Sequence, residues 1–94
     1  MFEWDDAKSQ DNLEKRGFDF EYAARIFKTG DLLEYEGRHR DYGERRMIAI
    51  GEVEGEILLV VYTWREYSRR IISARLASRR ERDAHRQTFS KSNR

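Results

Sequence analysis

The sequence predicts an α+β fold with the element order ααββββα: two N-terminal helices, a four-stranded antiparallel sheet and a C-terminal helix. Helix-capping signals and helical apolar spacing dominate the first thirty residues. Runs rich in Ile, Val, Leu and Tyr, joined by short turns, then follow up to a second set of capping signals near the end. The 94 residues suit a single domain, which we expect over 1–89, with a flexible tail over 90–94.

The two N-terminal helices have clear boundaries. Asp5 is a good N-cap for a helix that runs to residue 15 or 16, and Gly17 suits the left-handed position just after it. Asp19 caps a second helix. Its apolar residues fall at i, i+3, i+4 and i+7, which predicts one face that packs on the sheet: Phe20, Ala23, Ala24 and Phe27.

Four strands are predicted over residues 32–37, 45–53, 57–64 and 69–76, the first at an edge of the sheet. Glu54 and Gly55 suit a two-residue hairpin turn, and a second turn lies near residues 66–68. The last three strands therefore form an antiparallel meander. Ser78 and Glu81 form a capping box, which predicts a final helix over 79–88.

Composition excludes several kinds of protein. The chain has no cysteine, so it has neither disulfides nor a thiolate zinc site, and no acidic cluster has metal-ligand spacing. The longest apolar run, 57–62, is too short to cross a membrane, and the N-terminus lacks the pattern of a signal peptide. We therefore expect a cytoplasmic protein with no bound cofactor, no metal and no membrane association.

Charge is segregated along the chain. Residues 1–36 hold ten acidic and five basic residues, whereas residues 37–94 hold eight acidic and fourteen basic ones. Seven arginines lie between residues 69 and 86 alone. Such asymmetry indicates a basic surface for a polyanion, because guanidinium groups match phosphate oxygens with a planar fork of donors. The alternative is a set of solvated faces whose charges pair with one another.

Strand alternation predicts which arginines share a face. Because side chains alternate along a strand, Ile72, Ala74 and Leu76 are expected to pack on the second helix, while Arg69, Ile71, Ser73 and Arg75 point away from it. We expect a shallow RNA-binding surface to form where the following side chains converge, with aromatic residues nearby for base stacking: Arg45, Thr63, Arg65, Arg69, Ser73 and Arg75.

Two histidines are candidates for proton transfer, because imidazole titrates near neutral pH. His39 lies in a polar loop, where a solvated histidine is the simpler interpretation. His85 follows Glu81 by four residues on one helical face, and a surface pair is again the simpler account.

The sequence resembles the BrnT-type toxins over roughly residues 2–86. The segment GERRMIAIG, the run VVYT and the motif RIISAR, followed by Ala77 and by Glu81-Arg82, match the family core. The N-terminal helices match at a further set of positions: Trp4, Asp5, Lys8, Asn12, Lys15, Gly17, Phe20, Glu21 and an alanine pair.

The resemblance implies a RelE-like fold and endoribonuclease activity in a type II toxin–antitoxin system. The implied partner is a BrnA-type ribbon-helix-helix antitoxin in a complex of two toxins and two antitoxins, so that DNA is contacted only through the antitoxin. One interpretation is that an acidic antitoxin segment lies on the same arginine-rich surface that is expected to bind RNA. Two positions depart from the family pattern: Arg16 stands where a histidine is usual, and His85 where a tyrosine is usual.

The expected chemistry is metal-independent RNA cleavage, in which the 2′-OH attacks the adjacent phosphorus and arginines stabilise the developing charge. The expected catalytic residues are Arg45, Arg69, Arg75, Arg16, Glu81 and His85. The expected RNA-binding residues are Lys8, Lys15, Arg65, Arg70, Arg79, Arg80 and Arg82. The alternatives are a non-catalytic RNA- or ribosome-binding module, that is, an inactive toxin, and a protein whose charges serve only protein contacts.

Overall fold

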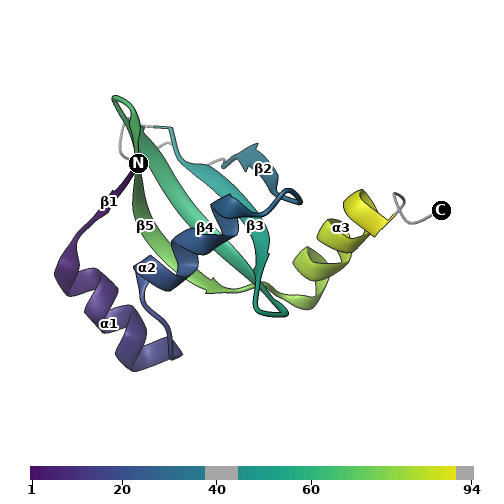
Figure 1. Ribbon diagram of the computed structural model, residues 1–94, viewed down its shortest axis with the longest axis horizontal. Helices are drawn as coiled ribbons and strands as arrows, with labels where there is room; N and C mark the ends of the chain where they lie inside the picture. The colour runs from purple at the N-terminus through teal and green to yellow at the C-terminus, as the bar shows by residue number, and fades with distance from the viewer. Residues whose placement is uncertain (38–44, 91–94) are drawn as a thin grey trace.

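The computed structural model describes residues 1–37 and 45–90, which form one five-stranded mixed sheet with helices around it (Figure 1). The strand order is β1-β5-β4-β3-β2. The elements are β1 (Phe2–Trp4), α1 (Asp6–Arg16), α2 (Phe20–Ala23), the 3₁₀ helix η1 (Ala24–Lys28), β2 (Leu33–Glu36), β3 (Met47–Val53), β4 (Glu56–Arg65), β5 (Ser68–Leu76) and α3 (Arg79–Phe89).

The antiparallel part of the sheet confirms the α+β prediction. Strands β2, β3, β4 and β5 pair with one another in sequence order, all antiparallel. The β3–β4 hairpin turns at Glu54 and Gly55, whose φ angles of 51° and 85° lie in the left-handed region that such turns require. The capping box of α3 is also present, with Ser78 accepting from Glu81 and Glu81 accepting from the Ser78 amide.

The expected sheet of four antiparallel strands is incomplete, because the sequence does not predict the first strand. The sheet has five strands and is mixed. Residues 2–4 form β1, which pairs in parallel with β5, from Phe2 opposite Arg69 to Trp4 opposite Ile71. A strand of three residues is too short to show an alternating pattern, and its partner lies far along the chain. The second predicted helix is also divided, because only α2 is α-helical and η1 continues it as a 3₁₀ helix.

The main core lies between the sheet and the segment made of α2 and η1, which crosses one face of the sheet (Figure 1). We call this face the helix face. Phe20, Ala23 and Ile26 are almost fully buried against Val60, Tyr62 and their neighbours. Gly51 of β3 permits this close approach, because a Cβ atom there would lie 2.9 Å from the Cβ atom of Ile26. The opposite face buries Ile50 and Leu59.

An irregularity in β5 reverses part of the predicted strand faces. Val61 pairs with Ser73, but the next residue of β4, Tyr62, pairs with Ile71, so that Ile72 is an extra residue in β5. A bulged residue interrupts the alternation of side chains. Arg69 therefore lies on the helix face beside Trp64, whereas Ser73 and Arg75 lie on the opposite face beside Val61 and Leu59. The prediction that Arg69 and Arg75 share a face is wrong.

Polar contacts attach α1 to the rest of the molecule. Ser9 and Asn12 are the buried residues of this helix. The Ser9 Oγ accepts a 2.9 Å hydrogen bond from the amide of Phe20, and the Asn12 Nδ2 donates one of 2.9 Å to the carbonyl of Phe18. These two bonds hold α1 against the turn that leads into α2. Over the described residues, no helix has the length and apolar character needed to cross a bilayer.

We expect Ser9→Ala to lower the free energy of unfolding by about 1–3 kcal/mol, because it leaves the buried Phe20 amide without its acceptor. Urea unfolding followed by circular dichroism measures this change. Gln10→Ala is the matched control, since Gln10 is the exposed neighbour and its change should stay within about 0.5 kcal/mol. Equal effects for the two variants would contradict the role given to Ser9.

Candidate functional site

Helix α1 presents a row of polar and basic side chains to β5. Asp5 caps the helix by accepting from the Lys8 amide at 3.0 Å, and Gly17 ends it at a φ of 91°. Lys8, Asn12 and Lys15 are spaced at i, i+4 and i+7, so they share one side of the helix, and Arg16 follows at its end. The caps Asp5 and Gly17 set where α1 begins and ends, and therefore which positions of the helix its cations occupy.

The part of β5 that faces α1 is the part beyond β1. The pairing of β1 ends where Trp4 meets Ile71, so within residues 1–37 and 45–90 no strand lies beside Ile72 and the residues after it on that side. Helix α1 contacts β5 there. The bulge at Ile72 therefore lies at the point where a neighbouring strand is replaced by a basic helix.

Between α1 and this edge of β5 lies a pocket of about 430 Å³, which we call the basic pocket. It has four basic side chains and one acidic one, a balance of +3. Asp11 is paired with Lys15 at 3.3 Å, but the side chains of Lys8 and Arg16 make no ion pair or hydrogen bond with any described residue. The lining residues are Lys8, Asp11, Asn12, Lys15, Arg16, Phe20, Ile72, Ser73, Ala74 and Arg75.

Arg75 forms a bidentate ion pair with Glu81. Its Nη1 and Nη2 donate to the two Glu81 carboxylate oxygens at 2.8 and 2.9 Å, and Nη1 also donates to the Leu76 carbonyl at 3.1 Å. Because a guanidinium has five N–H donors, the Nε–H and one Nη2–H of Arg75 remain for a ligand. Those two donors lie on one edge of the group, which suits a phosphate.

The same ion pair determines the charge of Glu81. The hydrogen bonds from Arg75 lower the pKa of Glu81 to about 2, assisted by the bond from the Ser78 amide, and the hydrogen bond to Glu81 raises the pKa of Arg75. A carboxylate with so low a pKa is a poor proton acceptor near neutral pH. The geometry therefore favours a positioning role for Glu81 over the predicted acid–base role.

Two of the predicted catalytic arginines, Arg45 and Arg69, do not line the basic pocket. Arg69 is stacked between rings, with its Cζ 4.3 Å from the Phe27 centroid and 4.7 Å from that of Trp64, and it pairs with Glu34 at 3.8 Å. Arg45 is 82% exposed and lies 3.6 Å from Glu36. The predicted convergence of Arg69 with Arg75 is thus wrong, because the bulge places them on opposite faces of the sheet. Arg45, beside Glu36 just before β3, does not line the basic pocket with Arg75 either.

His85 does not line the basic pocket either. It is buried, its Nε2 lies 2.9 Å from the carbonyl oxygen of Asp31, and its ring packs on Phe89 with centroids 4.7 Å apart. These contacts fasten α3 to the loop before β2. His39 lies outside the described residues, as do residues 91–94 of the predicted tail.

The predicted RNA-binding residues divide in the same way. Lys8 and Lys15 lie in the basic pocket, whereas Arg70 pairs with Glu3 at 3.1 Å and Arg82 donates to the Ala77 carbonyl at 3.0 Å. The others are exposed on the surface: Arg65, Arg79 and Arg80. Among the described residues, no group of three or more metal-ligating side chains comes together.

Sequence reasoning missed two polar side chains that line the pocket, Asp11 and Asn12. They follow Lys8 by three and four residues, a spacing that places them on the same side of α1 as Lys15. That spacing would have found them, had the helix rather than β5 been taken as the centre of the site.

The fold and the basic pocket define a small α+β protein with a cationic cleft at the edge of its sheet, a class suited to binding a polyanion. Residues 4–81 match a family model described as "Ribonuclease toxin, BrnT, of type II toxin-antitoxin system". The match covers most of the chain, so the protein belongs to this family of ribonuclease toxins, whose type II systems pair each toxin with a protein antitoxin. No curated protein matches the chain.

We expect Glu81→Gln to reduce the free energy of unfolding by about 1–2 kcal/mol at pH 7, since the pair with Arg75 is only partly shielded from water. Because folding lowers the pKa of Glu81, its contribution is complete above pH 5 and is lost as the pH falls toward 2.

Urea unfolding of both proteins at a series of pH values tests this. The difference in unfolding free energy between wild type and Glu81→Gln should shrink below about pH 4.5, the ordinary carboxyl value, and disappear only below about pH 2. A difference that stays constant over this range would show that the Glu81 charge contributes nothing.

Proposed function

We propose that this chain is a metal-independent endoribonuclease and that the basic pocket holds the scissile phosphate. The observation that carries the proposal is the meeting of Lys8, Lys15 and Arg16 from α1 with Arg75 from β5 in one pocket. Four cations in a pocket of this size suit the charge of a phosphate diester and its neighbours. Membership of a ribonuclease toxin family supports RNA as the substrate.

The proposed reaction is an internal transfer at phosphorus. The 2′-oxygen of the RNA forms a bond to the adjacent phosphorus as its proton passes to solvent, and the bond from phosphorus to the 5′-oxygen breaks. The leaving 5′-oxygen takes up a proton, for which the ammonium of Lys8 or Lys15 is the nearest donor type in the pocket. The products are a 2′,3′-cyclic phosphate and a free 5′-hydroxyl.

The pocket would accelerate this reaction by stabilising charge. Negative charge builds on the non-bridging oxygens as the phosphorus becomes five-coordinate, and donors already in place stabilise that charge most. Arg75 has two parallel donors left after binding Glu81, and the side chain of Arg16 makes no ion pair or hydrogen bond with a described residue. Arg16 can hold phosphate where the family usually has histidine, although it cannot serve as a base.

We propose that Glu81 acts through Arg75. Glu81 also accepts from the Ser78 amide at 2.7 Å, so it joins the start of α3 to the arginine of β5. The guanidinium is thereby fixed in orientation before RNA binds, which lowers the cost of ordering it. Arg45, Arg69 and His85 have structural contacts elsewhere, and the proposal gives them no part in the chemistry.

For the partner, we propose a BrnA-type ribbon-helix-helix antitoxin in a complex of two toxins and two antitoxins. Family membership supports a protein antitoxin, and the resemblance noted above supports this type.

We expect Arg16→Ala and Arg75→Ala each to lower the rate of RNA cleavage by about 10²–10³, the usual cost of removing one donor to developing charge. The measurement is cleavage of a defined single-stranded RNA in excess EDTA, with the cyclic phosphate ends identified by mass spectrometry. Lys28→Ala is the control, because Lys28 is an exposed cation outside the basic pocket.

Full activity in folded Arg16→Ala and Arg75→Ala would place the phosphate elsewhere. If wild-type protein binds RNA without cleaving it, with and without ribosomes, the chain is a binding module or an inactive toxin. In that case Arg16→His tests whether the family's usual residue restores cleavage.

A further inference from the structure

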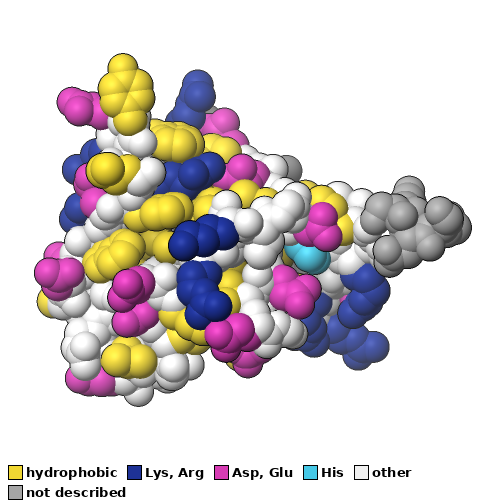
Figure 2. All heavy atoms as spheres, in the orientation of Figure 1, with side chains coloured by type: hydrophobic (Ala, Val, Ile, Leu, Met, Phe, Trp, Pro, Cys, Tyr) yellow, Lys and Arg dark blue, Asp and Glu magenta, His cyan; other side chains and the backbone are white. Residues whose placement is uncertain are grey.

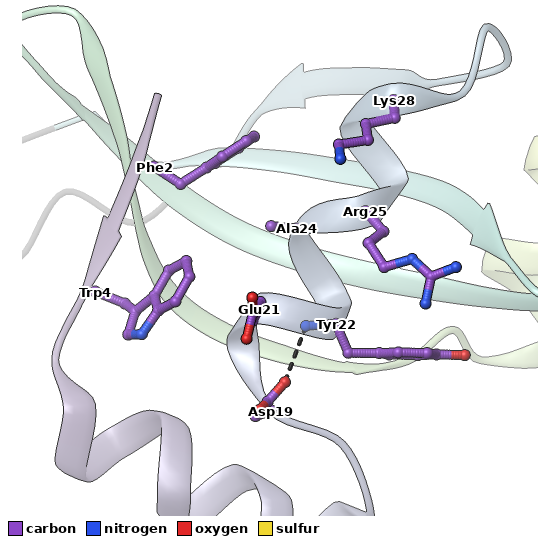
Figure 3. Close-up of a pocket in the computed structure, with 8 residues that line it drawn as sticks. All are labelled: Phe2, Trp4, Asp19, Glu21, Tyr22, Ala24, Arg25 and Lys28. Atoms are coloured by element: carbon purple, nitrogen blue, oxygen red, sulfur yellow. Dashed lines mark hydrogen bonds between the residues drawn. The ribbon is translucent and has the colours of Figure 1, made fainter.

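A second cavity, of about 580 Å³, lies on the helix face between β1 and the segment made of α2 and η1 (Figure 3). We call it the β1–α2 slot. The rings of Phe2 and Trp4 form its wall on the β1 side, and Glu21, Ala24 and Lys28 follow the helix on the other side. The remaining lining residues are Asp19, Tyr22 and Arg25.

The two ends of the slot carry opposite charges, Glu21 and Lys28, with which no described residue pairs. Asp19 caps α2 by accepting from the Tyr22 amide at 2.9 Å, and Arg25 pairs with Glu54 at 3.1 Å. The side chains of Glu21 and Lys28, by contrast, make no ion pair or hydrogen bond with a described residue. Glu21 and Lys28 are seven positions apart along α2 and η1, or roughly 10–13 Å along the helix axis.

The slot differs from the basic pocket in charge. Its two acidic and two basic lining residues balance, whereas the basic pocket has a balance of +3. A phosphate chain in the slot would lie beside two carboxylates, which disfavours RNA there. An aromatic wall with single charges at its two ends suits a protein segment that buries an apolar side chain.

The apolar surface continues beyond the slot. Phe2 packs on Phe27 with centroids 5.3 Å apart, and Phe27 forms one side of the stack that holds Arg69 and ends at Trp64. Trp64 is 49% exposed. Figure 2 shows hydrophobic side chains gathered on the half of this face that lies over β1 and the β4–β5 hairpin. Aromatic residues with arginine are typical of the energetic centre of an interface.

We propose that the β1–α2 slot, with the adjoining Phe27 and Trp64 rings, is the docking surface for the antitoxin. The bound segment would place an aromatic or aliphatic side chain against Trp4, an acidic residue at Lys28 and a basic residue at Glu21. This inference rests on the type II family membership, which requires a protein partner, and not on the proposed phosphate site. The antitoxin then binds a surface other than the basic pocket.

Charge reversals at the two ends of the slot test the proposal with little risk to folding, because Glu21 and Lys28 are both exposed. The measurement is the dissociation constant for the antitoxin encoded beside this toxin, by isothermal titration calorimetry. Lys28→Glu and Glu21→Lys should each weaken binding about tenfold or more, since each sets like charges together at the interface. Both variants should cleave RNA as wild type does.

Arg16→Glu is the matched control, because it makes the same change in charge at an exposed residue of the basic pocket. It should bind the antitoxin within about twofold of wild type, as its charge lies outside the interface. Trp4→Ala removes the aromatic wall and should also weaken binding. If Trp4→Ala fails to fold, the three charge reversals still decide the question.

Two results would overturn the proposal. In the first, Lys28→Glu and Glu21→Lys bind the antitoxin as wild type does while Arg16→Glu loses binding, which places the antitoxin in the basic pocket. In the second, Lys28→Glu lowers kcat/KM for RNA without changing the antitoxin dissociation constant, which makes the slot an RNA subsite. Failure of the phosphate-site proposal would appear only in cleavage by Arg16→Glu, so the two failures are distinguishable.

Discussion

One extra residue in β5, Ile72, determines how the charged surfaces of this protein are arranged. Because it interrupts the alternation of the strand, Arg69 lies on the helix face and Arg75 on the other. It also lies where β1 ends and α1 takes its place beside β5. Without the bulge, Arg69 and Arg75 would point the same way, and Arg69 could not enter its stack between Phe27 and Trp64.

The basic pocket is built from elements that are anchored independently. Two buried hydrogen bonds fix α1, which carries three of the cations: Ser9 accepts from the Phe20 amide, and Asn12 donates to the Phe18 carbonyl. Glu81, at the start of α3, fixes the fourth, Arg75. Like charges brought together would repel one another, so the fold must hold them by contacts outside the pocket. The two anchors are polar and short-range, and neither uses the donors of Arg16 and Arg75 that we propose for phosphate.

Local chemistry made much of the fold predictable from sequence. Asp5, Gly17 and the Ser78 capping box mark helix ends, and Glu54-Gly55 marks a hairpin, because each acts through neighbouring backbone atoms. The strand β1 and the bulge at Ile72 depend on pairing between distant residues, which no local pattern contains. Residue type alone marked Arg75 and the cations of α1 as candidates. Their meeting in one pocket depends on that long-range pairing, so the sequence does not predict it.

The central claim is that phosphate binds between α1 and β5. The most direct test is an NMR titration of the arginine side chains with a fully 2′-O-methylated RNA, which cannot be cleaved because no 2′-hydroxyl is free to attack. The account predicts that the Nε–H signals of Arg16 and Arg75 shift with RNA concentration while that of Arg69 does not. Shifts at Arg69, with Arg16 and Arg75 unchanged, would contradict it and place the RNA on the helix face.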